Sequence, residues 1–161
     1  MKPSELVRAI VIILLGIGLM LGLQPWLFAS GTIFLEDVEL QEWVPSYAVG
    51  TYLVLGTTLL VTIIWLLLTS LVKPSGGVVD VPLWRVWWFV LLLFPIVAIC
   101  VALYFFNPSR QDPSQDALLW LALFYPLDVL WMYWLTTVTS TPKQFLYVPP
   151  LGLIIRKILD G

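Results

Sequence analysis

Residues 83–106 read LWRVWWFVLLLFPIVAICVALYFF, an apolar stretch in which Arg85 is the single charged residue. A bilayer core about 30 Å thick is crossed by about 20 apolar residues in helical form, since each residue advances the helix by about 1.5 Å. The stretch is longer than this minimum. Its pattern therefore predicts a transmembrane helix.

Three further stretches of the same kind lie on either side of it, at residues 6–27, 48–71 and 117–138. The whole chain is 60% hydrophobic and 11% charged, with a mean hydropathy of +0.97, whereas soluble domains carry roughly a quarter charged residues. The sequence therefore predicts an all-α, polytopic integral membrane protein. We expect residues 1–161 to form one domain of four transmembrane helices.

The first stretch has a second interpretation, because Lys2 and Arg8 precede or open the apolar run and small residues follow it at 29–31. These features are shared with a cleavable signal peptide. The apolar run is longer than a usual signal core, and Phe28 fits poorly before a cleavage site. We expect an uncleaved first transmembrane helix.

Basic residues predict the orientation of the chain, because short loops rich in Lys and Arg stay on the cytoplasmic side. Seven of the eight basic residues fall on one side of the four predicted helices. These are Lys2, Arg8, Lys73, Arg85, Lys143, Arg156 and Lys157. The opposite side holds Arg110 and an acidic loop with Glu36, Asp37, Glu39 and Glu42. Both termini are predicted to be cytoplasmic.

The tail after Pro142 is too short and too interrupted by proline for a fifth span. Residues 151–159 have two interpretations. They form a short helix on the membrane surface, with Arg156 and Lys157 toward lipid phosphates, or they pack under the helix bundle.

The chain contains no histidine, so it lacks the commonest general base and the commonest ligand of transition metals. Its one cysteine, Cys100, lies inside an apolar run. A formal charge of −2 and an absence of basic clusters argue against nucleic acid as a partner. The acidic loop is interpreted as solvated, since its loose spacing does not suit calcium. We expect neither a metal site, a cofactor nor an enzymatic activity.

Asp128 is the ionisable residue nearest the middle of a predicted span. A carboxylate at that depth costs about 2.5–3.5 kcal/mol on insertion scales, so it is expected to face the bundle, a cavity or a partner. Thr58 and Thr62 lie at helical spacing and similar depth, and Tyr125 is three residues before Asp128. These four residues form the predicted site, either for a proton or cation or for helix packing.

Gly18 and Gly22 form a G-x-x-x-G pair in the first span. Small residues at this spacing allow two helices to approach closely in a membrane. The pair predicts a helix contact, either within this chain or with another.

Two functions remain open from the sequence. The leading hypothesis is a small non-catalytic subunit, scaffold or assembly factor of a larger membrane complex, because the chain is small and suited to helix packing. The alternative is a homo-oligomeric transporter or ion or proton channel that uses Asp128. The expected partners are membrane lipids and either other membrane subunits or further copies of the chain. A bacterial inner membrane is the expected location, with a thylakoid-type membrane as the alternative.

Overall fold

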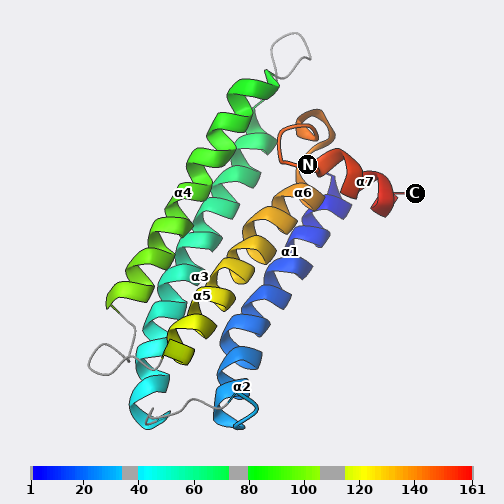
Figure 1. Cartoon of the computed structure of the whole chain (residues 1–161). Coiled ribbons are helices and arrows are strands. Elements are labelled where there is room, and N and C mark those ends of the chain that lie inside the picture. Colours follow the sequence, from blue (N-terminus) through cyan, green and yellow to red (C-terminus); the bar gives the residue numbers. More distant parts are fainter. Residues whose placement is uncertain (1, 34–39, 73–79, 106–114, 161) are drawn as a thin grey trace.

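The computed structural model describes residues 2–33, 40–72, 80–105 and 115–160. Within these ranges every regular element is helical. Four long helical rods lie side by side, and both ends of the chain lie at the same end of the bundle (Figure 1). The predicted all-α fold is confirmed.

The four rods are long and apolar enough to cross a membrane, and they match the predicted spans closely. The first span, Pro3–Ala29, consists of α1 (Pro3–Gly18), the π-helix η1 (Leu19–Leu23) and α2 (Gln24–Ala29). The second and third spans lie within α3 (Leu40–Leu71) and α4 (Val81–Phe105). The fourth combines α5 (Gln115–Val129), the π-helix η4 (Leu130–Leu135) and α6 (Thr136–Ser140).

Helix α3 begins earlier than the hydropathy pattern indicates. It starts at Leu40 and includes Pro45, which lacks the N–H that would bond to the carbonyl of Gln41. Glu42 of the predicted acidic loop belongs to this helix. The predictions for Glu36, Asp37, Glu39, Lys73 and Arg110 lie outside the described residues.

The fourth span packs against each of the other three. Tyr133 donates a hydrogen bond to the carbonyl of Trp88 on α4, at 2.7 Å. The indole of Trp88 donates to Thr137 at 3.1 Å, and the indole of Trp65 on α3 donates to Thr141 at 3.0 Å. Buried polar groups in the fourth span therefore tie it to its neighbours, while apolar side chains fill the spaces between them.

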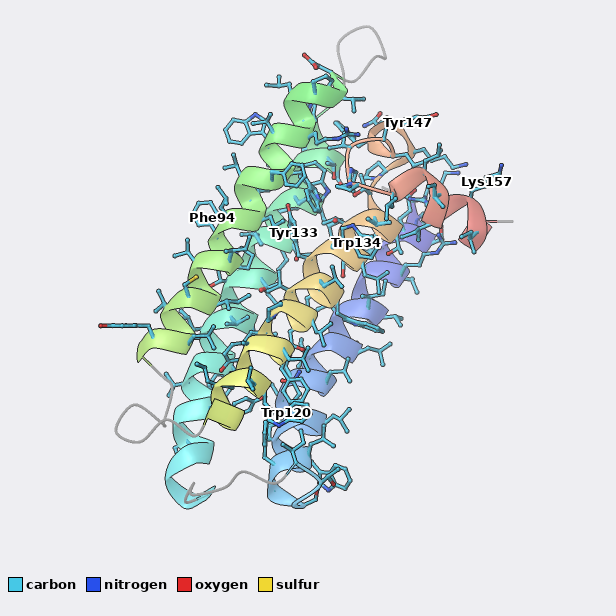
Figure 2. The ribbon with its side chains drawn as sticks, in the orientation of Figure 1. Phe94, Trp120, Tyr133, Trp134, Tyr147 and Lys157 are labelled. Atoms are coloured by element: carbon cyan, nitrogen blue, oxygen red, sulfur yellow. The ribbon has the colours of Figure 1, made fainter. Side chains whose placement is uncertain are left out.

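The outer surface of the bundle is apolar. Large hydrophobic side chains are exposed on every span, including Leu14, Leu60, Phe94 and Leu119, and Figure 2 shows where Phe94 lies on α4. A soluble protein rarely exposes contiguous apolar area of this extent. The exposed faces and the helix lengths together define a multi-pass helical membrane protein.

The tail folds back over the end of the bundle that carries the termini (Figure 1). It contains the 3-10 turn η5 (Lys143–Phe145) and the helix α7 (Gly152–Asp160). Arg85 on α4 donates to the carbonyl of Tyr147 at 2.7 Å, and Trp134 donates to the carbonyl of Pro150 at 3.1 Å. Gly152 lies so close to the chain that an added Cβ would be 2.5 Å from the carbonyl oxygen of Leu146.

Arg156 corrects one expectation for this tail. Its side chain is buried, and it forms an ion pair of 2.5 Å with Glu5 at the start of α1. It also donates to the carbonyl of Thr141 at 2.6 Å. Of the two interpretations of the tail, the one that turns Arg156 toward lipid phosphates does not hold for this residue, because a buried carboxylate in α1 binds its side chain. Lys157 is exposed.

Candidate functional site

Asp128 lies in α5, only 5% exposed, at the interface between the fourth and first spans. Its Oδ1 accepts a hydrogen bond of 2.7 Å from Nε2 of Gln24, the first residue of α2. The two residues are separated by 104 positions in the chain. An amide from the first span is therefore the direct partner of the intramembrane carboxyl.

A second hydrogen bond extends this pair to the second span. The Tyr47 hydroxyl donates to Oε1 of Gln24 at 2.7 Å, so both ends of the Gln24 amide are used. The ring of Tyr47 stacks on that of Tyr125 with centroids 6.4 Å apart. Thr51 lies beside both tyrosine hydroxyls, and its own side chain is buried. Three spans thus converge on one polar cluster, defined by Gln24, Tyr47, Thr51, Tyr125 and Asp128.

Two of the predicted site residues lie outside this cluster. Thr58 donates to the carbonyl of Val54 at 2.6 Å, and Thr62 donates to the carbonyl of Thr58 at 2.7 Å. Threonine hydroxyls in a helix readily bond to the carbonyl four residues earlier, and this local bond competes with longer-range partners. Neither hydroxyl bonds to Asp128 among the described interactions, and Thr62 also reaches the carbonyl of Met132 at 3.3 Å.

The second carboxylate oxygen of Asp128, Oδ2, is not bound by Gln24. Oδ2 is buried and makes no hydrogen bond to any described residue. Leaving a buried acceptor unsatisfied costs about 1–3 kcal/mol, and more for a charged group. The cluster therefore retains one strong, unused acceptor.

An apolar groove of about 360 Å³ borders Asp128 between the first and fourth spans. Its lining is formed by leucine and aromatic side chains, with Gln24 and Asp128 as the amide and carboxyl groups. The two tryptophans of the lining use their N–H groups elsewhere: Trp131 donates to the carbonyl of Ile12 at 3.2 Å and Trp134 to Pro150. Within the described lining, Asp128 Oδ2 is thus the buried side-chain acceptor that has no hydrogen-bond partner.

The two π-helices face each other across this groove. Leu19 and Leu23 of η1 line one side, and Leu130 and Leu135 of η4 line the other. π-helical turns are rare and are often found at functional sites. Pro25 explains η1 locally, because its ring would clash with the carbonyl of Leu21 in a regular α-helix, and the wider turn relieves that clash.

Gly18 and Gly22 do not make the predicted contact within this chain, since a Cβ added to either would meet nothing within 4 Å. Their contact with another chain stays a prediction. Gly16 is the glycine at the helix interface, since an added Cβ would collide with Sδ of Met132 in η4. Close approach of the first and fourth spans depends on Gly16.

Reasoning from sequence located Asp128 and Tyr125 and included Thr51 in the threonine stripe of the second span, but it missed Gln24 and Tyr47 as partners of Asp128. A usable signal existed for Gln24, because it is the one amide inside the predicted first span. Comparison of the chain with protein-family models, with curated proteins and with solved structures finds no match. The function must therefore be argued from the geometry of the cluster and its groove.

Proposed function

We propose that this chain is a non-catalytic membrane subunit that holds a transmembrane helix of a partner protein in the groove between its first and fourth spans. The observation that carries the proposal is the buried, unpartnered Oδ2 of Asp128 beside an apolar groove. A partner residue with an N–H or O–H donor would supply the missing hydrogen bond. The apolar lining would pack against the rest of the partner helix.

The dimensions of the groove support a helix as the occupant. A volume of about 360 Å³ takes a few side chains, so a partner helix would lie against the bundle and insert part of one face. Leu23 and Leu127 stand at the groove and are 45% and 49% exposed. Polar side chains that bond across helices, with apolar packing around them, are a recurring means of association in membranes.

A second candidate, a homo-oligomeric transporter or ion or proton channel, is favoured by the same carboxyl. Asp128, Gln24 and Tyr47 form a continuous chain of hydrogen bonds across three spans. In this case Asp128 would bind a proton or cation, and copies of the chain would have to complete the pathway. This candidate predicts flux in liposomes that Asp128→Asn abolishes.

Site-specific photo-crosslinking in the native membrane tests the leading proposal. A photoreactive residue at position 23 or 127 is expected to give an adduct with one foreign membrane protein. The matched control is position 93 on α4, where Leu93 is 57% exposed but lines none of the described cavities. The partner peptide in the adduct should carry a basic, amide or hydroxyl side chain within a transmembrane segment.

Two variants connect the adduct to the site. Asp128→Asn is expected to reduce the adduct at least tenfold, and Leu127→Trp should reduce it similarly by filling the groove while Asp128 is retained. Adducts of equal yield at positions 23, 127 and 93 would overturn the proposal. Adducts of the chain with itself, together with Asp128-dependent flux, would establish the second candidate instead.

A further inference from the structure

Two further cavities lie at the end of the bundle that carries the termini, away from the Asp128 groove. One is an apolar groove of about 550 Å³ between residues 2–13 of the first span and residues 63–70 of α3. The other is a polar cavity of about 420 Å³, formed by Lys2, Glu5 and residues 142–144 of the tail. Lys2 lines both of them, so the two cavities adjoin.

The polar cavity has a positive balance of charge. Both carboxylate oxygens of Glu5 are already occupied: Oε1 by Arg156 at 2.5 Å, and Oε2 by the backbone N–H of Lys2 at 2.7 Å. Lys2 and Lys143 are exposed. Among the described interactions neither lysine ammonium group has a hydrogen bond or ion pair, so both remain available to an anion placed between them.

The adjoining groove is aliphatic along its length. Leu6 and Ile10 on α1 and Ile63 and Leu67 on α3 are each about half exposed along it. The one hydroxyl in its lining, that of Ser70, is satisfied by the carbonyl of Leu66 at 2.6 Å. The groove therefore offers hydrocarbon contact and no unpaired polar group of its own beyond Lys2.

The length of the groove matches one leaflet of a bilayer. From position 2 to position 13 a helix advances about 16 Å at about 1.5 Å per residue. Half of a hydrocarbon core about 30 Å thick is about 15 Å. An acyl chain that starts beside Lys2 would run along the groove to about the bilayer midplane.

We propose that these two cavities together bind an anionic phospholipid. The headgroup phosphate lies between the ammonium groups of Lys2 and Lys143, and an acyl chain lies between α1 and α3. The amide of Gln144, which also reaches the carbonyl of Val72 at 3.4 Å, borders the headgroup. The polar cavity recognises the charge of the phosphate, and the aliphatic groove recognises the hydrocarbon chain. A free phosphate ion has no hydrocarbon chain and would occupy only the polar cavity.

Native mass spectrometry of the full chain in mild detergent tests this site. The protein is titrated with phosphatidylglycerol and, in parallel, with phosphatidylcholine of the same acyl chains. We expect tighter binding of phosphatidylglycerol. The double variant Lys2→Gln/Lys143→Gln should bind it about 30-fold more weakly, if each basic residue contributes roughly 1 kcal/mol toward an anionic lipid.

Matched variants separate the two halves of the site from general effects. Ile63→Trp should weaken lipid binding by filling the groove with no change of charge, whereas Leu93→Trp on the far face of α4 should not. Lys157→Gln removes one charge from α7, outside both cavities, and should leave binding within twofold. A loss with Lys157→Gln equal to that of the double variant would overturn the proposal, as would full binding by Ile63→Trp or displacement of the lipid by inorganic phosphate.

Discussion

Asp128 and Gln24 show how this protein accommodates a buried carboxyl within a span. The amide satisfies one oxygen of the carboxyl and is itself held by Tyr47, so the position of Asp128 is set by residues from two other spans. The second oxygen has no partner among the described residues, and an apolar groove borders the pair.

Gln24→Leu tests the pair at this scale. The variant would leave both oxygens of Asp128 without a described partner, and we expect it to destabilise the protein by about 1–3 kcal/mol. Thermal or denaturant unfolding in detergent measures the effect. The double variant Gln24→Leu/Asp128→Leu should recover the part of the loss that comes from Asp128, whereas the Tyr47 hydroxyl loses its Gln24 acceptor in both variants. A double variant as unstable as Gln24→Leu would contradict this account.

Asp128 was predictable from the sequence and Gln24 was not recognised, for a physical reason. A carboxyl within an apolar stretch can be recognised from the sequence, because its position along the stretch gives its depth in the membrane and hence its insertion cost. Its partner depends on how the first span is rotated and where it crosses the fourth. Hydropathy does not encode that rotation. From sequence, the threonines of α3 are equally plausible partners of Asp128, but in the structure Thr58 and Thr62 bond to carbonyls of their own helix.

At the scale of elements, the contact between the first and fourth spans depends on Gly16 and on two π-helical turns. Gly16 allows Met132 and Trp131 of η4 to approach the backbone of α1. The π-turns then widen each helix at the level of the Asp128 groove. The two glycines of the G-x-x-x-G pair, Gly18 and Gly22, lie on an open face of the first span. The spacing identifies a stripe of small residues on a helix, but it does not identify the helix that packs against that stripe.

Gly16→Leu should therefore behave differently from Gly18→Leu. The leucine at position 16 would collide with Met132, which is fully buried, and such overpacking costs about 1–3 kcal/mol. Gly18→Leu meets open space and should change stability by no more than about 0.5 kcal/mol. Melting temperatures of the two variants in the same detergent provide the comparison. Equal destabilisation would show that the first span packs in another rotation.

At the scale of the whole molecule, the four spans were predictable because the length and hydropathy of each stretch suffice to define it. The predicted limits differ from the structure by at most a few residues, as between 6–27 and Pro3–Ala29. The tail was less predictable. Arg156 is separated from Glu5 by 151 positions, and the sequence around either residue does not predict their ion pair.

Arg156→Met tests how firmly the two ends of the chain are joined. It removes the buried cation from Glu5, and loss of one partner of a buried pair typically destabilises by about 3–5 kcal/mol. The double variant Glu5→Leu/Arg156→Met should regain much of that loss. Lys157→Met, on an exposed neighbour, is the control and should be neutral. Unfolding curves in detergent would contradict the ion pair's role if Arg156→Met and Lys157→Met were equally stable.

The bond between Gln24 and Asp128 also has a consequence for biosynthesis. The ribosome makes Asp128 104 residues after Gln24, which at about 5–20 residues per second is roughly 5–20 s later. During that interval the amide of Gln24 lacks its acceptor on Asp128. The interval between the synthesis of Glu5 and that of Arg156 is longer still. The polar contacts of the first span are thus completed only after Asp128 and Arg156 have been synthesised. A chaperone that shields the first span during this delay would act on the nascent chain.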